Sequence, residues 1–266
     1  MNRKRFLALT SLSALFALGV TTACTPSGGG ETADAEGDKV LIMATSADYP
    51  PYEFYETASG GGEPVGFDVD IAKAITEKLG YTLEIEDMDF NGIIPALQAG
   101  RADFAMAGMT PTDERKESVD FSQIYYDAKN TIVSSKGSGL AAYEDLEGRK
   151  VGVQLGSIQE GEAKDKSETI SMTIEPRNKV SELIQEVKAG RLDAAIVEDT
   201  VAKGYVLNNE DLEFSTVETD EVSGSAIAFP KDSPLAAEFD QALTELVESG
   251  EIEGMVTTWF EDYYNQ

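Results

Sequence analysis

Two stretches of this chain, IIPALQAGRADFAMAG at residues 93–108 and LIQEVKAGRLDAAIVED at residues 183–199, follow one plan. Each begins as an amphipathic helix, with apolar residues recurring every three or four positions. Each helix then meets a glycine, Gly100 or Gly190, which can adopt the left-handed conformation that ends a helix. A basic residue, an aspartate and an apolar strand follow in both. The repetition predicts two α/β units of similar design, and therefore two similar lobes.

Strands and helices also alternate through the rest of the chain. Short apolar runs at residues 40–45, 81–86 and 150–154 are typical of buried strands. Between the first two, Asp68 is expected to cap a helix that Gly80 ends. This alternation predicts an α/β fold with mostly parallel sheets.

The stretch AGMTPTDERKESVDF at residues 107–121 contains the most informative polar pattern. An apolar strand ends in Gly108, and a polar turn leads to a helix start at Thr112 or Asp113 that carries Arg115. A guanidinium beside free backbone N–H groups binds a carboxylate in a two-pronged arrangement. The pattern therefore indicates a carboxylate receptor. The alternative is a surface helix with an exposed arginine.

The start of the chain is not expected to belong to the fold. Residues 1–23 have a basic beginning and then an apolar run that is too short for a membrane span, which is typical of a secretory signal. Cys24 is the only cysteine and cannot form an internal disulfide. Residues 24–38 are expected to be a flexible tether.

The chain is strongly acidic, with a formal net charge of -28 from 21 basic and 49 acidic residues. Removal of the signal takes away three basic residues, so 18 minus 49 leaves -31. Such a surface repels nucleic acid and anionic membranes, so neither is an expected partner. A solubilising or salt-adapted surface explains the charge, and attraction of cationic solutes is the alternative.

The blocks DFNGIIPALQAGRADFAMAG, AGMTPTDER and SQIYY resemble the polar amino-acid-binding proteins that feed ABC importers, and the resemblance covers about residues 40–260. It implies a type II periplasmic-binding-protein fold, with two lobes and two hinge crossovers near residues 130–134 and 223–229. The implied division is 39–128 and 224–266 for lobe one and 129–223 for lobe two. The implied partners are a free L-amino acid and the membrane subunits of an importer, with the protein a monomer.

Cys24 also resembles the lipidated cysteine of bacterial lipoproteins, although Thr21 stands where that pattern usually has leucine. The resemblance implies a lipid anchor on the extracellular face of the cell membrane, or in the periplasm if the source is Gram-negative. An incidental cysteine near a cleavage site is the alternative.

Ligands in open α/β sheets bind beyond the carboxyl ends of strands, and four such ends carry polar or small groups here. Arg115 and Thr110 are expected to bind the α-carboxylate, with Ser157 and the N–H of Ile158 adding a helix N-terminus. The resemblance assigns the α-ammonium to Asp199, for which a plain helix cap is the alternative. Aromatic stacking is assigned to Tyr49 and Phe90, and core packing is their alternative. The full expected site is Ser46, Tyr49, Glu53, Phe90, Ala107, Gly108, Thr110, Arg115, Gln154, Ser157, Ile158 and Asp199.

The identity of the ligand depends on the side-chain end of the pocket. Candidates there are Ser46, Glu53, Gln154, Gln159 and Glu198. The segments VGVQLGSIQE, IVEDTVAKGY and GSAIAF resemble arginine-binding lipoproteins of Gram-positive bacteria. Arginine is therefore the expected ligand, and glutamine is next because glutamine binders share the DFxGIIPALQ and AGxTxTDER blocks.

An enzyme is the main competing class. The chain has no histidine, which excludes Ser-His-Asp and Cys-His catalysis and the commonest zinc sites. No P-loop is present, and no GxGxxG follows a strand. We expect no catalysis, no cofactor and no metal. A dehydratase-like enzyme on the same fold and the sensing domain of a receptor are the alternatives.

Overall fold

The computed structural model describes residues 39–56, 61–217 and 223–263. The expected signal, the expected tether and Cys24 lie outside these residues, so those assignments stay predictions. Within the described ranges, no helix is both long enough and apolar enough to cross a membrane.

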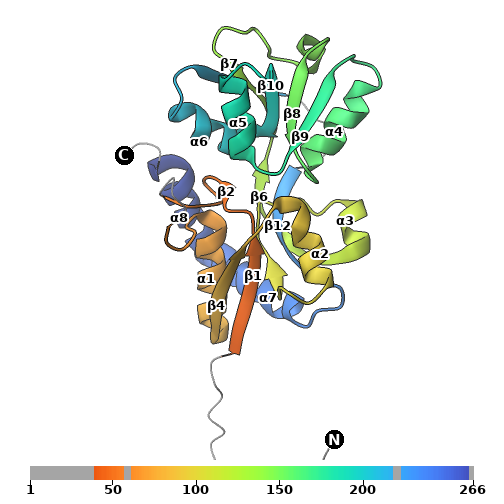
Figure 1. Ribbon diagram of the computed structural model, residues 1–266. Helices are drawn as coiled ribbons and strands as arrows, with labels where there is room; N and C mark the ends of the chain where they lie inside the picture. The colour runs from red at the N-terminus through yellow and green to blue at the C-terminus, as the bar shows by residue number, and fades with distance from the viewer. Residues whose placement is uncertain (1–38, 57–60, 218–222, 264–266) are drawn as a thin grey trace, which may run out of the picture. The chain divides into compact units, whose positions relative to one another are not determined.

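Five strands form the first sheet, in the order β4-β1-β5-β12-β6 (Figure 1). Its strands are β1 Lys39–Thr45, β4 Tyr81–Asp87, β5 Phe104–Ala105, β6 Val119–Ala128 and β12 Ser223–Pro230. Its helices are α1 Phe67–Leu79, α2 Ile93–Gln98, α3 Asp113–Ser118, α7 Leu235–Ser249 and α8 Glu251–Val256. A small hairpin of β2 Asp48–Tyr49 and β3 Glu53–Phe54 and the short helical turns Phe90–Gly92 and Thr257–Asp262 complete this part, which we call lobe one.

Five further strands form the second sheet, in the order β11-β7-β10-β8-β9. Its strands are β7 Asn130–Ser135, β8 Lys150–Gln154, β9 Thr173–Arg177, β10 Ala194–Glu198 and β11 Leu212–Thr216. Its helices are α4 Ile158–Ser167, α5 Val180–Lys188, α6 Asp199–Leu207 and the short turn Tyr143–Leu146. We call this part lobe two.

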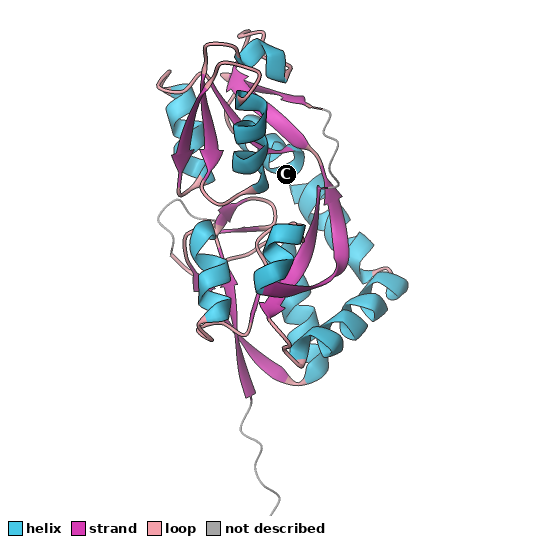
Figure 2. Cartoon of the chain, turned by 90° about the vertical axis from the view of Figure 1, so that its right-hand side faces the viewer, coloured by secondary structure: helices cyan, strands magenta, loops and turns pink. Residues whose placement is uncertain are grey.

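Helices cover both faces of each sheet because successive strand residues point to opposite sides (Figures 1 and 2). In lobe one, Phe104 packs in a core with α1 and α7, whereas the next residue, Ala105, packs in another core with α2. In lobe two, Val197 packs with α5 and α6, and its neighbour Ile196 packs with α4. Both sheets are therefore apolar on both faces, and the predicted α/β fold is confirmed.

The prediction of mostly parallel sheets is wrong. The pairs β1–β4, β1–β5, β8–β9 and β8–β10 are parallel, but β5–β12, β6–β12, β7–β10 and β7–β11 are antiparallel. These four antiparallel pairs all involve the strands next to the passages between the two sheets. Strand β6 runs into β7 through Lys129 alone, so the two strands enter their sheets without a helical crossover.

The hinge segments predicted near residues 130–134 and 223–229 each belong to one sheet. Residues 130–134 lie in β7 of the second sheet, and residues 223–229 lie in β12 of the first. The chain passes between the sheets at Lys129 and again between the ends of β11 and β12. Extended residues within a sheet and extended residues beside a crossing have the same sequence pattern, so the pattern did not separate them.

Local helix signals agree with the structure at most positions. Gly80 ends α1 in the left-handed conformation with φ 75°, and the Thr112 side chain caps α3 by accepting from the N–H of Arg115. Asp68 is the exception, because α1 begins one residue earlier, at Phe67 after Gly66. The Asp68 carboxylate instead accepts a hydrogen bond from the N–H of Gly108, at 2.9 Å.

Candidate functional site

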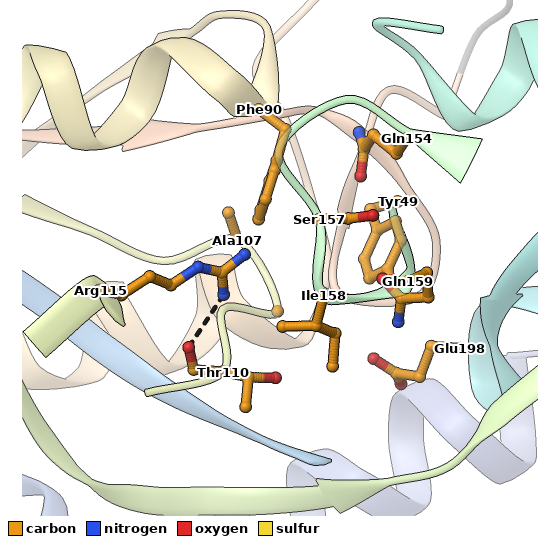
Figure 3. A pocket seen from close by; sticks show the side chains of 11 residues that line it. Tyr49, Phe90, Ala107, Thr110, Arg115, Gln154, Ser157, Ile158, Gln159 and Glu198 are labelled. Carbon is orange, nitrogen blue, oxygen red and sulfur yellow. Dashed lines mark hydrogen bonds between the residues drawn. The ribbon is translucent and has the colours of Figure 1, made fainter. Parts of the chain in front are cut away.

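A pocket lies where strand ends of both lobes meet, and its empty space, solvent included, is about 300 Å³. The residues that line it are Tyr49, Phe90, Ala107, Gly108, Thr110, Arg115, Gln154, Ser157, Ile158, Gln159 and Glu198. Figure 3 shows Arg115 and Glu198 on opposite sides of this space, with the Phe90 and Tyr49 rings and the Ile158 side chain also facing it.

Arg115 is held in the pocket by both lobes. Its Nη1 donates to the carbonyl of Thr110 at 2.9 Å (Figure 3). Its Nη2 donates to the carbonyl of Gly156, in lobe two, at 3.0 Å. The guanidinium carbon lies 5.3 Å from the centre of the Phe90 ring. Burial lowers the pKa of Arg115 to about 10, so the group stays a cation at neutral pH. A guanidinium has five N–H donors, and these two bonds leave others for an anion.

Two glycines let the backbone of each lobe approach the pocket. Gly108 has φ 56°, and a Cβ on it would lie 2.9 Å from Cε1 of Tyr49. Gly156 has φ 80°, and a Cβ on it would lie 3.2 Å from Cβ of Asn91 in lobe one. A side chain at either position would strain the backbone and crowd the facing residue, so glycine is required at both.

The first turn of α4 faces the pocket with its N-terminus. Ser157 caps this helix by accepting from the N–H of Glu160 at 3.1 Å, and the Glu160 carboxylate accepts from the N–H of Gly156 at 2.7 Å. These two bonds form a variant of the capping box, which fixes where the helix begins. The N-terminal end of a helix carries partial positive charge, so Ile158 presents its N–H in a field that favours an anion.

Glu198, at the end of β10, is the acidic group of the pocket. Its side chain is buried, and its carboxylate accepts from the hydroxyl of Tyr52 at 2.5 Å and from the hydroxyl of Thr200. Burial raises the pKa of Glu198 to about 8, and the two hydroxyls oppose this effect only in part. A cationic ligand group would make the charged form of Glu198 more favourable.

Asp199, which the sequence analysis assigned to the ammonium, does not line the pocket. Its carboxylate turns the other way and accepts from the N–H of Lys129 at 3.2 Å and from the N–H of Thr200 at 3.0 Å. Glu198 is the last residue of β10 and Asp199 is the first residue of α6, and their carboxylates accept from different partners. The structure places Glu198 in the pocket lining.

Ser46 and Glu53 also lie outside the pocket lining, although both are buried. The Ser46 hydroxyl donates to Oδ1 of Asp48 at 3.2 Å. Neither carboxylate oxygen of Glu53 has a hydrogen-bond partner among the described residues. Burial, together with the nearby Asp68, raises the pKa of Glu53 far above its ordinary value.

The remaining nine residues of the expected site line one pocket, namely Tyr49, Phe90, Ala107, Gly108, Thr110, Arg115, Gln154, Ser157 and Ile158. Glu198 and Gln159 complete the lining, and from the sequence both are candidates only for the side-chain end of the pocket. Gln159 donates from Nε2 to Oδ1 of Asn130 at 2.8 Å. Its position in the first turn of α4, two residues after the cap Ser157, is the signal that could have placed it.

Comparison with known proteins gives a consistent result. The model of the bacterial extracellular solute-binding proteins, family 3, matches residues 41–262. The arginine-binding extracellular protein ArtP of Bacillus subtilis (strain 168) is 48% identical over 248 residues, which cover 92% of this chain and 96% of that protein.

Two solved structures are similar in fold and sequence. An ancestral arginine-binding protein bound to arginine superposes with a TM-score of 0.78 at 40% identity, over 83% of this chain and 98% of that one. An ancestral arginine-binding protein bound to glutamine gives a TM-score of 0.77 at 40% identity, over 84% and 99%. The similarity of fold extends through both lobes.

Proposed function

Because the chain belongs to family 3 of the bacterial extracellular solute-binding proteins, we propose that it binds a free polar L-amino acid for an ABC importer, with arginine as its preferred ligand. Arginine is supported by the similarity to ArtP and to the arginine-bound ancestral protein. Glutamine is the second candidate, since a similar ancestral protein is bound to it.

One observation carries the proposal: a buried guanidinium and a buried carboxyl group, those of Arg115 and Glu198, face one pocket from different lobes. A free amino acid has an α-carboxylate and an α-ammonium on the same carbon, so it can bind both groups. Arg115 binds the carboxylate, with the carbonyl of Thr110 orienting the guanidinium. Glu198, in place of Asp199, accepts from the ammonium.

The side chain of the ligand then extends along the rest of the lining. The rings of Phe90 and Tyr49 offer apolar contact and cation–π attraction to a guanidinium, worth about 0.5–2 kcal/mol per ring. The amides of Gln154 and Gln159 offer hydrogen bonds that suit arginine and glutamine alike. This shared chemistry supports arginine first and glutamine second.

Binding from both lobes also provides a signal for the importer. A ligand that contacts two lobes favours the arrangement in which they meet, so occupied and empty protein differ in conformation. We assign residues 39–128 and 224–266 to lobe one and 129–223 to lobe two, a division that the membership of the two sheets supports except at Ser223, the first residue of β12 in lobe one. The membrane subunits of the importer then recognise the closed form, and the protein acts as a monomer.

The ends of the chain complete the proposal. Cys24 carries the lipid anchor on the extracellular face of the membrane, after cleavage of residues 1–23. The protein returns its ligand chemically unchanged, and it is neither a dehydratase-like enzyme nor a sensing domain.

Calorimetric titration of the purified protein with the twenty L-amino acids tests the ligand class. We expect saturable one-to-one binding of arginine and weaker binding of glutamine. Recovery of unaltered ligand by chromatography separates a binder from an enzyme. Absence of binding by every amino acid would refute the proposed function, and tight binding of glutamine without arginine would refute the preference.

A further inference from the structure

The two lobes also meet outside the pocket, where the hairpin of lobe one touches the start of α5 in lobe two. Oδ2 of Asp48 accepts from the N–H of Ser181 at 3.2 Å. The main-chain carbonyl of Asp48 accepts from the hydroxyl of Tyr205, on α6, at 2.8 Å. The side chain of Asp48 is only 12% exposed, so these contacts are shielded from solvent.

Helix α5 has one capping contact of its own, because the carboxylate of Glu182 accepts from the N–H of Lys179 at 3.4 Å. The residue at its N-cap is Lys179, and a lysine side chain has donors but no acceptor, so it cannot cap. The first N–H groups of a helix need acceptors, and Asp is among the best of them. Asp48 supplies that acceptor from the other lobe, and its negative charge also suits the positive end of the helix.

Lys179 reaches in the opposite direction, from lobe two into lobe one. Its ammonium lies 3.4 Å from Oγ of Ser46, 3.5 Å from Oδ1 of Asp87 and 3.3 Å from the carbonyl of Met88. It also lies 3.9 Å from Oδ1 of Asp48. The lysine side chain is 25% exposed, so its charge is partly shielded from water.

These contacts form one group with complementary charges, and none of its members lines the ligand pocket. The acids and the acceptor oxygens around the ammonium belong to lobe one, and the cation and the helix N-terminus belong to lobe two. Ser46, which the sequence analysis placed at the ligand side chain, instead donates to Asp48 within this group.

We propose that Asp48 and Lys179 form a clasp that stabilises the closed arrangement of the lobes, with Asp48 capping α5 across the cleft. The inference rests on the proposed function, because the clasp matters when an amino acid closes the lobes. Opening exposes the α5 N-terminus and separates Lys179 from its oxygens. The clasp therefore shifts the balance between open and closed protein and changes the apparent affinity for every ligand by the same factor.

Three variants and a control test the clasp. Asp48→Ala removes the cap, Asp48→Asn keeps an acceptor without the charge, and Lys179→Met removes the cation. Lys188→Met is the control, since Lys188 sits at the far end of the same helix and pairs with Asp211 of the same lobe. Each is titrated with L-arginine and with L-glutamine, and dissociation rates are measured by stopped flow.

We expect Asp48→Ala and Lys179→Met to lower the affinity for both amino acids equally, by about tenfold, because the ligand dissociates faster. Asp48→Asn is expected to cost about threefold, because asparagine caps nearly as well but carries no charge. The control should stay within about twofold of the parent, as surface pairs contribute little. Thermal unfolding without ligand should change less than thermal unfolding at saturation.

The possible failures are distinguishable. A parent protein that binds no amino acid overturns the proposed function and the clasp with it. A parent that binds normally, with Asp48→Ala and Lys179→Met unchanged, overturns the clasp alone. If the variants bind arginine more weakly but bind glutamine as the parent does, these residues face the ligand side chain. That result also overturns the clasp. If Asp48→Ala lowers the thermal stability equally with and without ligand, Asp48 only supports its own lobe, and the clasp is overturned.

Discussion

The carboxylate clamp is the feature that substitution tests most sharply. Arg115 is 9% exposed, and its guanidinium is oriented by the carbonyls of Thr110 and Gly156. Arg115→Ala leaves the ligand carboxylate without its two charge-assisted hydrogen bonds, each worth about 1.5–3 kcal/mol. The sum of roughly 3–6 kcal/mol corresponds to a dissociation constant raised by about a hundredfold to ten-thousandfold.

Arg115→Lys separates charge from geometry. Lysine keeps the positive charge but replaces the planar fork with a point charge. We therefore expect about half of the loss of binding free energy that Arg115→Ala causes. Arg101→Lys is the matched control, because Arg101 is exposed in the turn after α2 and does not line the pocket.

Agmatine, which is arginine without its carboxylate, supplies the second half of the assay. Arg115 has nothing to bind on agmatine, so parent and Arg115→Ala should bind it equally weakly in calorimetric titrations. If Arg115→Ala weakens agmatine as much as arginine, the residue supports the pocket without touching the carboxylate. Arginine affinity within threefold of the parent in both variants would remove Arg115 from the site altogether.

Four further predictions follow from the acid of the pocket and from the anchor. Glu198→Gln should lower the affinity for arginine by about ten- to a hundredfold, because a charged partner of the ammonium is lost. Unaltered affinity would contradict the assignment of Glu198 to the ammonium. The same variant should unfold at a higher temperature than the ligand-free parent at pH 8 in a melting experiment. A buried carboxyl whose pKa is raised from 4.5 to about 8 makes the parent lose stability across that pH range, because the group ionises in the unfolded protein but not in the folded one. In the parent, arginine affinity should rise with pH from 6 to 8, by at most about tenfold per unit, and binding should release a proton; a flat profile would refute ionisation of Glu198 on binding. Cys24→Ser should leave the protein uncleaved or released from membranes, and mass spectrometry that finds cleavage elsewhere would refute the anchor.

Local signals predicted much of the fold. The glycines that end helices, the caps at Thr112 and Ser157, and the apolar strand runs all act within a few residues, so one sequence contains them. The antiparallel half of the strand pairs was not predicted. Those pairs join segments far apart in the chain, and their direction depends on where the chain passes between the sheets.

The candidate site, like the fold, has one part that local sequence predicts and one part that it does not. Arg115, Thr110 and Gly108 belong to one strand–turn–helix unit, and their joint position follows from it. The choice between Glu198 and Asp199 depends on which side of one strand end faces the pocket, and hydropathy does not decide between two adjacent acids. Ser46 lies outside the pocket lining and bonds to Asp48 and Lys179, and the contact with Lys179 forms only where the lobes meet.

A crystal structure of the protein with L-arginine is the most direct test of the central claim, that one amino acid is held between Arg115 of lobe one and Glu198 of lobe two. The account predicts the ligand carboxylate within hydrogen-bond distance of the Arg115 guanidinium and the N–H of Ile158. It predicts the ligand ammonium against the Glu198 carboxylate, and the guanidinium between Phe90 and Tyr49. A ligand whose carboxylate or ammonium contacts neither Arg115 nor Glu198 would contradict it.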